Sequence, residues 1–193
     1  MPDVIGRFPP LGEKLPDLPN LALIGRAGSG KTTAANYLVK HRGYDIHHFA
    51  SPLKRAAEEL WENPGREELQ RLGIACREID ENVFVDNLLT YLDEFPTGRP
   101  VVVDDCRFPN EVEALEERGF MFIRIWADED TRVHRLQAKG KFQTREQLEH
   151  ESETALDDMW NFDEAVPNPA HGTRIDFYKS IDRALDRLRA RVA

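Results

Sequence analysis

The sequence predicts an α/β fold in which a five-stranded parallel sheet lies between two layers of helices. From residue 21 onward, short apolar runs that suit strands alternate with amphipathic stretches that suit helices. Such alternation is typical of a parallel sheet, because the chain must cross back over the sheet between successive strands. The chain has 193 residues, of which 40% are hydrophobic and 32% are charged, so it can bury one core of ordinary size.

The first half of the chain opens with residues 1–20, which contain five prolines and no hydrophobic period, and we expect an extended arm there. Ser51 and Pro52 are a suitable N-cap and first-turn proline for a helix, and Asn63-Pro64-Gly65 ends it. The patterns of this half predict strands at residues 21–24 and 44–49, and helices at 31–40, from 51 to that break, and at 80–95.

The second half begins with the clearest strand pattern, residues 100–105, where three valines are followed by two aspartates. Pro109 suits the first position of a short helix, and Gly119 suits the position just after its end. The remaining patterns predict a strand at residues 121–126, a helix at 128–138, a polar flap at 139–150, a last strand at 162–166 and a closing helix at 173–191.

Residues 25–32 read Gly-Arg-Ala-Gly-Ser-Gly-Lys-Thr, which matches the phosphate-binding pattern GxxxxGK followed by Ser or Thr. The motif follows a predicted strand and precedes a predicted helix, which is the context that it requires. Its glycines let the backbone wrap phosphates with N–H groups inward, while Lys31 reaches the outer phosphates and the Thr32 hydroxyl ligates Mg²⁺. The motif predicts a bound nucleoside triphosphate, held by Gly25, Arg26, Ala27, Gly28, Ser29, Gly30, Lys31, Thr32 and Thr33.

Asp104 and Asp105 end the predicted strand at residues 100–105, and Arg107 follows them. Ligands of parallel α/β sheets bind at the carboxyl ends of the strands, so we expect these side chains in the cleft of the phosphate loop. Two carboxylates there can hold Mg²⁺ together with Thr32, and Arg107 suits a forked contact with a phosphate. The alternatives are a solvated turn for the aspartates and a local ion pair for Arg107.

Residues 105–111 read Asp-Cys-Arg-Phe-Pro-Asn-Glu, which fits a D-x-R-F-x-N-E signature. Four further motifs accompany it: F-A-x-P-L-K in residues 48–54, L-Q-x-x-G in 69–73 with Arg77 close behind, H-x-S-E in 150–153, and Asn168 after the last strand. This ordered set resembles the tailed-phage deoxynucleoside monophosphate kinases over about residues 20 to 190.

The resemblance implies transfer of the γ-phosphate of ATP to a deoxynucleoside monophosphate, with the diphosphate and ADP as products. It implies a P-loop NTPase fold like that of the nucleoside monophosphate kinases, in one domain at residues 21–193. Within this domain we expect a helical substrate-binding insertion at about residues 51–95 and a lid at about 127–152. The cofactors implied are ATP and Mg²⁺.

The same resemblance implies roles for particular side chains. Arg132 and Arg135 lie three apart on one helix face, where nucleoside monophosphate kinases place lid arginines; a salt-bridge pattern with the acids before them is the alternative. Arg77 falls in what reads as a polar loop. Asn168 is expected beside ATP. The acceptor would be held by Lys54, Gln70, Arg77, Arg107 and Glu153, and the catalytic set would be Lys31, Asp105, Arg107, Arg132 and Arg135.

Composition narrows the partners. The net charge of −9 argues against a nucleic-acid polymer as ligand, and the sequence shows neither an apolar run long enough to span a membrane nor a signal peptide. Two cysteines without paired or metal-ligand spacing fit a reducing cytoplasm, that of the host if a phage encodes the chain. An apolar strip on the helix at residues 80–95 suits either a homodimer surface or internal packing.

Two other functions stay open on the sequence alone. A P-loop kinase of a different small metabolite, such as a sugar or shikimate, would use Asp104 or Asp105 as a base toward a hydroxyl acceptor. A nucleotide-gated switch or ATPase would share the phosphate loop, but the chain has no Asn-Lys-x-Asp tetrad that would read guanine.

Overall fold

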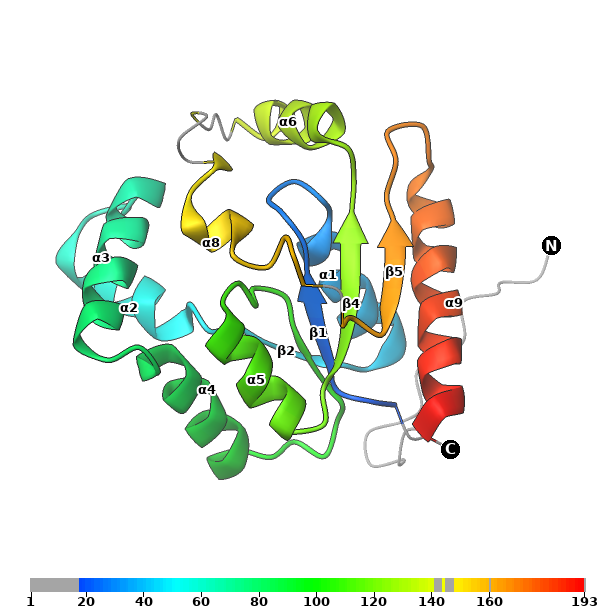
Figure 1. The fold of residues 1–193 in the computed structure, drawn as a ribbon, viewed down its shortest axis with the longest axis horizontal. Coiled ribbons are helices and arrows are strands. Elements are labelled where there is room, and N and C mark those ends of the chain that lie inside the picture. The colour runs from blue at the N-terminus through cyan, green and yellow to red at the C-terminus, as the bar shows by residue number, and fades with distance from the viewer. Residues whose placement is uncertain (1–17, 141–143, 145–147, 160, 193) are drawn as a thin grey trace. The chain divides into compact units, whose positions relative to one another are not determined.

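The computed structural model describes residues 18–140, 144, 148–159 and 161–192 (Figure 1). Residues 1–17 of the expected arm and half of the expected flap, residues 141–143 and 145–147, lie outside the described residues. Residues 47–98 form a compact unit of their own, and the rest of the described chain forms the other unit. The predicted division into domain, insertion and lid stays a prediction.

A five-stranded sheet forms the centre of the larger unit, and it confirms the predicted α/β fold. β1 pairs in parallel with β3 and β4, with Leu21 opposite both Val102 and Met121, and β4 pairs in parallel with β5. β1, β3 and β4 are short and largely apolar, as suits a sheet that is covered by helices. The strand order is β2 (Asp45–His47), β3 (Val101–Val103), β1 (Leu21–Ile24), β4 (Met121–Trp126) and β5 (Glu164–Pro167).

Helices cover the sheet and leave the carboxyl ends of its strands for loops. α1 (Lys31–Arg42) and α9 (Arg174–Val192) share one buried cluster with the sheet, in which Leu38, Ile123 and Ile181 are almost fully buried. In Figure 1, α1 lies behind the sheet and α5 (Pro109–Glu117) lies in front of it. The other helices of this unit are α6 (Glu129–Ala138) and α8 (Glu151–Thr154).

The smaller unit is helical. It contains α2 (Ser51–Leu60), α3 (Arg66–Ile79) and α4 (Val83–Glu94). Ser51 is the first residue of α2 rather than its cap, a position that Ala50 takes without a side-chain bond. Of the described helices in the chain, none is long and apolar enough to cross a membrane.

The prediction that Arg77 lies in a polar loop is wrong, because residues 66–79 form α3. Glu67 and Glu68 lie in its first turn and Arg77 lies in its last, and both placements are favourable toward the helix dipole. Gly73 lies inside the helix, where a Cβ would meet Arg77 Nη1 at 3.3 Å. A glycine in the middle of a polar stretch favours a loop when only the sequence is considered.

Candidate functional site

The phosphate loop holds three glycines at positive φ: Gly25 at 135°, Gly28 at 80° and Gly30 at 116°. Glycine adopts this region without steric cost, whereas other residues rarely do. Neighbouring groups also leave no space for a side chain. A Cβ on Gly25 would lie 2.1 Å from the carbonyl oxygen of Ile125, and one on Gly30 would lie 2.4 Å from Nδ2 of Asn168. The loop is therefore closely packed between the ends of β4 and β5.

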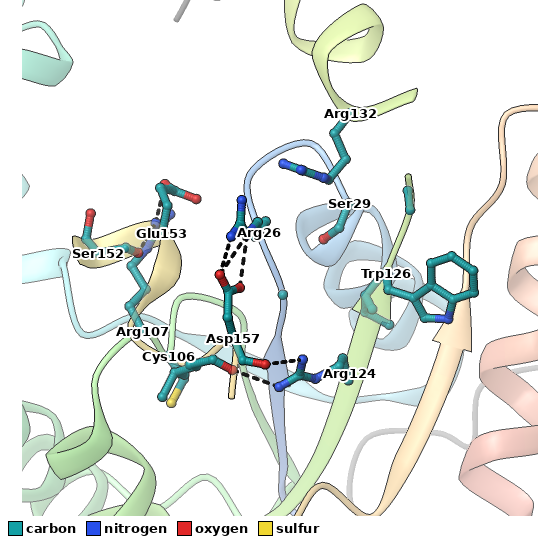
Figure 2. A pocket seen from close by; sticks show the side chains of 14 residues that line it. Arg26, Ser29, Cys106, Arg107, Arg124, Trp126, Arg132, Ser152, Glu153 and Asp157 are labelled. Carbon is teal, nitrogen blue, oxygen red and sulfur yellow. Dashed lines mark hydrogen bonds and ion pairs between the residues drawn. The ribbon is translucent and has the colours of Figure 1, made fainter. Parts of the chain in front are cut away.

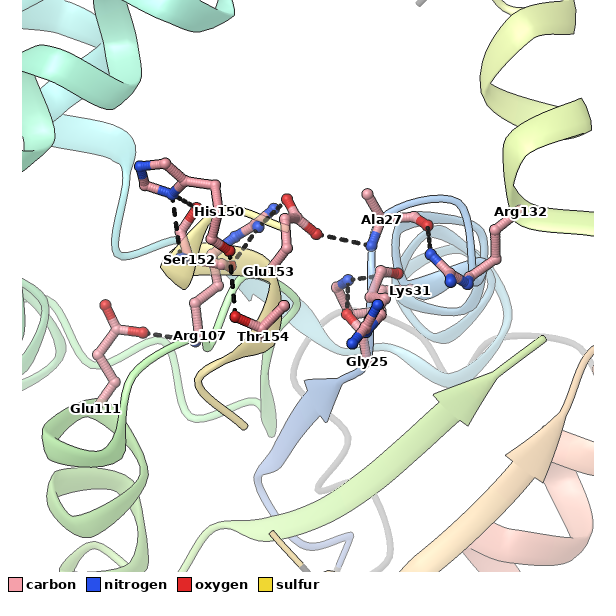
Figure 3. A network of polar contacts seen from close by, with 11 residues as sticks. Gly25, Ala27, Lys31, Arg107, Glu111, Arg132, His150, Ser152, Glu153 and Thr154 are labelled. Carbon is pink, nitrogen blue, oxygen red and sulfur yellow. Dashed lines mark hydrogen bonds and ion pairs between the residues drawn. The ribbon is translucent and has the colours of Figure 1, made fainter. Parts of the chain in front are cut away.

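Lys31 is buried at the start of α1, and its Nζ donates to the carbonyl oxygens of Gly25 and, at 3.3 Å, of Arg26 (Figure 3). Burial lowers the pKa of Lys31 to about 8, and the positive charge of Arg107 adds to this effect. Nearby carboxylates oppose the lowering of this pKa only in part. An anion bound in the loop would favour the charged form of Lys31.

β3 ends at Val103, so Asp104 and Asp105, which were predicted as its last residues, follow it directly, and both carboxylates act electrostatically on Lys31. Asp104 is buried, with 5% of its surface exposed. Thr32 lies in the first turn of α1 and is exposed to solvent. Two carboxylates and one hydroxyl are hard oxygen donors, so this set suits Mg²⁺, which prefers such ligands together with water and phosphate oxygens.

Arg107 and the phosphate loop share one carboxylate, that of Glu153 (Figure 3). Glu153 Oε2 accepts a hydrogen bond of 2.8 Å from the backbone N–H of Ala27, and Oε1 accepts one from Nη1 of Arg107. The same Nη1 also donates to the carbonyl oxygen of Ser152 at 2.8 Å. Burial works against the charge of Arg107, but the nearby carboxylates of Glu153, Asp105 and Glu111 together more than offset it, so the pKa of Arg107 is raised.

The backbone around Arg107 is held from the other side by α5. Glu111 Oε2 accepts from the N–H of Arg107 at 2.7 Å and from the N–H of Phe108 at 3.2 Å. A glutamate at the third helical position that bonds back to the cap is the reciprocal half of a capping box. The final Glu of the predicted D-x-R-F-x-N-E signature therefore has a local structural role, since it fixes the turn that carries Arg107.

A pocket of about 190 Å³ opens beside the phosphate loop (Figure 2). Asp157, which also lines it, accepts from Nε of Arg26 at 2.9 Å. No sequence motif predicts this contact, because the two residues are 131 positions apart. The lining is rich in guanidinium groups, which suits phosphate oxygens. These groups belong to Arg26, Arg107, Arg124 and Arg132.

The predicted lid arginines contact the loop region from α6. Arg132 is buried, and its Nη1 donates to the carbonyl oxygen of Ala27 at 3.4 Å. Arg135 Nη2 donates to Oδ1 of Asn168 at 3.3 Å, and Asn168 Nδ2 donates to the carbonyl oxygen of Ser29 at 2.7 Å. Burial lowers the pKa of both arginines. The structure thus brings Arg132, Arg135 and Asn168 to the phosphate loop.

The other predicted acceptor ligands lie in the smaller unit. Lys54 is in α2 and lines a pocket of about 560 Å³ in that unit, together with Trp61 and Leu69. Arg77 lies over the ring of Phe84, 4.7 Å from its centroid, and donates to the carbonyl oxygen of Gly73 at 3.3 Å. Among the described residues, Nε2 of Gln70 is buried and has no hydrogen-bond partner. Their roles toward an acceptor stay predictions.

Comparison with known families and proteins gives two findings at the level of sequence. A family model described as an AAA domain matches residues 21–157. A protein of Acanthamoeba polyphaga mimivirus, named as a deoxynucleotide monophosphate kinase, is 32% identical over 139 residues. The alignment covers 54% of this chain and 72% of the mimivirus protein.

Solved structures give the same fold. A gluconokinase from Sinorhizobium meliloti 1021 is 15% identical, with a TM-score of 0.56 over 93% of this chain and 97% of its own. The protein TT1252 from Thermus thermophilus is 19% identical, with a TM-score of 0.61 over 92% and 100%. A shikimate kinase from Acinetobacter baumannii is 14% identical, with a TM-score of 0.56 over 90% and 96%. These likenesses show that the chain has the P-loop kinase fold.

Proposed function

The chain belongs to the AAA domain family, and we propose that within it the protein transfers the γ-phosphate of ATP to a deoxynucleoside monophosphate. The link from Arg107 through Glu153 to Ala27 carries this proposal, because it connects the phosphate loop to the arginine of the D-x-R-F-x-N-E signature. A kinase needs such a connection, since its donor and acceptor phosphates must meet in line. The name of the mimivirus relative supports the same acceptor class.

The donor side follows from the loop. Backbone N–H groups and Lys31 would hold the ATP phosphates, and Arg132 and Arg135 would offset the charge that develops on the transferred group. Asn168 would keep the loop closed through its bond to Ser29. Mg²⁺, held through Thr32, Asp104 and Asp105, would neutralise charge on the phosphate oxygens.

The reaction requires no general base. An oxygen of the acceptor phosphate is already anionic at neutral pH, so it can bond to the γ-phosphorus while the bond to the bridging oxygen breaks and ADP leaves. Arg107 would hold the acceptor phosphate with a forked contact, and Asp105 would remain at the metal. Catalysis is then a matter of positioning and charge stabilisation, for which this site of arginines, one lysine and carboxylates is suited.

On the acceptor side, we assign Lys54, Gln70, Arg77 and Glu153 to the deoxynucleotide. Gln70 is the candidate for reading the base, because its buried amide nitrogen has no hydrogen-bond partner among the described residues. The run at residues 105–111 supports the tailed-phage branch of these kinases. The net charge of −9 supports a small acceptor over a nucleic-acid polymer.

Two finer assignments complete the proposal. Cys76 and Cys106 are both free thiols, which supports our assignment of the protein to a reducing cytoplasm. Tyr91 near the end of α4 and Phe95 just after it are exposed, and their rings lie tilted toward each other with centroids 5.0 Å apart; we assign this face to a homodimer.

A coupled assay of ADP release tests the function. Purified protein, Mg²⁺ and ATP are given dTMP, dGMP, dAMP and dCMP in turn, with gluconate and shikimate as acceptors of other kinases of this fold. We expect at least one deoxynucleotide to raise ADP release well above the background, and gluconate and shikimate to leave it unchanged. If only gluconate or shikimate stimulated ADP release, the proposed acceptor would be wrong and the protein would be a kinase of another class.

A further inference from the structure

Arg124 is a charged residue in the middle of β4, between buried Ile123 and Ile125. Its side chain reaches toward the pocket beside the phosphate loop, where Figure 2 shows it pointing at the segment of Asp157. Its guanidinium donates to the carbonyl oxygens of Leu156 at 2.7 Å, of Asp157 at 3.2 Å and of Met159. One arginine thus holds three carbonyl groups of one short segment.

That segment has little stability of its own. α8 spans four residues, and turns follow it through Asp158. A helix of this length does not persist in water, because nucleation costs more than a few hydrogen bonds return. His150 caps its start, where Nδ1 accepts from the N–H of Ser152 at 3.2 Å. Arg124 holds the other end of the segment, through its hydrogen bonds to the carbonyl oxygens after α8. The guanidinium of Arg124 lies over the ring of Phe162, 5.0 Å from the ring centroid.

The segment carries the two carboxylates that contact the site. Glu153 bonds the N–H of Ala27 and the guanidinium of Arg107, and Asp157 bonds Arg26. A shift of the segment would therefore move Arg107 relative to the phosphate loop. A misplacement of about 1 Å at a reacting centre can lower the rate about a hundredfold.

We propose that Arg124 is a positioning residue of the phosphate-transfer site, which acts by holding residues 153–159 so that Glu153 and Asp157 fix the phosphate loop and Arg107. It differs from the arginines that would contact phosphate. Arg124 directs its donors at backbone carbonyls of the segment, and burial lowers its pKa. Among the described residues its Nε has no hydrogen-bond partner.

A double-mutant cycle tests this role. Arg124→Lys keeps the charge and loses the fork, while Glu153→Gln keeps the shape and loses the charge. Mg-ATP binding is measured by calorimetry for each single variant and for the double variant, and kcat is measured with the best acceptor. We expect each single change to weaken Mg-ATP binding about tenfold and to lower kcat about tenfold. The double variant should have the same Mg-ATP affinity and the same kcat as the more impaired of the two single variants.

Arg187→Lys is the matched control. Arg187 also makes a forked contact, to Glu164, with Nε at 3.0 Å and Nη2 at 2.8 Å, but it lies in α9. We expect its effect on Mg-ATP binding to be small and to add independently to that of Glu153→Gln. The melting temperature of every variant is recorded, so that loss of stability is separated from loss of binding.

Three results would overturn the proposal. The first is that the effects of Arg124→Lys and Glu153→Gln on Mg-ATP binding simply multiply in the double variant. The second is that Arg124→Lys keeps wild-type Mg-ATP binding and kcat. The third is that both Arg124→Lys and Arg124→Gln fail to fold, which would make the arginine purely structural. The kcat arm rests on the proposed function, whereas the binding arm does not. If no deoxynucleotide is phosphorylated but the binding cycle shows coupling, the proposed acceptor is wrong and the role of Arg124 stands.

Discussion

Glu153 accepts a hydrogen bond of 2.8 Å from the backbone N–H of Ala27, a residue that lies 126 positions earlier in the chain. The bond joins the phosphate loop to the short helix α8, which lies far outside the loop's own motif at residues 25–32. Because the other carboxylate oxygen bonds Arg107, the geometry of the loop and that of the arginine depend on one buried side chain.

Replacing Glu153 with alanine should therefore affect both stability and catalysis. The change leaves the Ala27 N–H and Arg107 without this partner, and an unsatisfied buried group costs about 1–3 kcal/mol. We expect the free energy of unfolding in urea to fall by about that amount, and kcat to fall as well. Glu116→Ala is the control, since the bond of Glu116 to Asn161 is exposed and its loss should change stability by at most about 0.5 kcal/mol. Equal losses of stability in the two variants would show that the hydrogen bonds of Glu153 contribute no more to stability than an exposed one.

Gly28→Ala should abolish nucleotide binding, because a Cβ there would lie 2.7 Å from the carbonyl oxygen of Arg132. Gly119 offers a matched comparison at nearly the same φ, 72° against 80°, with no atom within 4 Å of its added Cβ. Gly119→Ala should cost only the left-handed strain, about 1–2 kcal/mol, and should keep nucleotide binding. Calorimetric titration with Mg-ATP measures the difference. Tight binding by the Gly28 variant would contradict the close packing described for the loop.

Mg-ATP binding should weaken as the pH rises above about 8, the pKa of Lys31 in the free protein. Phosphates bind the charged form of Lys31 better than the neutral form. The affinity for Mg-ATP is therefore constant below this pKa, and it falls above it, where Lys31 is neutral in the free protein but still charged in the complex. We expect the dissociation constant to rise by up to about tenfold per pH unit above it. Lys31→Arg keeps its charge over this range and should bind with no such rise. A flat profile in the natural protein would mean that Lys31 does not meet the phosphates.

Arg107→Lys should impair the use of the acceptor more than the binding of ATP. Lysine cannot make the forked contact, so we expect the acceptor KM to rise or kcat to fall by about tenfold or more, with a smaller change in the Mg-ATP dissociation constant. Steady-state kinetics with each substrate varied in turn separates the two. A defect confined to ATP binding would place Arg107 on the donor side.

The sequence predicted the parts of the site that local geometry determines. Eight consecutive residues encode the phosphate loop, because the positions of Gly25, Gly28 and Gly30 demand positive φ and Lys31 begins a helix. Asp104 and Asp105 were predicted at the end of an apolar strand, and in the structure they follow directly after β3. Such features repeat wherever the same short pattern occurs, so a pattern is enough to find them.

The residues that the sequence did not reveal act over long distances in the chain. Asp157 reaches Arg26 across 131 positions, and Arg124 reaches Leu156 across 32. The one local sign of Arg124 is a charge between two apolar residues of a strand, which is unusual for a position inside a covered sheet. The helix that carries Arg77 was missed because Gly73 favours a loop in isolation.

The most direct test of the central claim follows the phosphate itself. ATP labelled with radioactive phosphorus in the γ position is incubated with protein, Mg²⁺ and each deoxynucleoside monophosphate, and the products are separated by chromatography. We predict that the label appears in a deoxynucleoside diphosphate at a rate that equals ADP release, and that Lys31→Ala lowers this rate about a thousandfold or more. Label found only in inorganic phosphate, with every acceptor, would contradict the account and make the protein an ATPase.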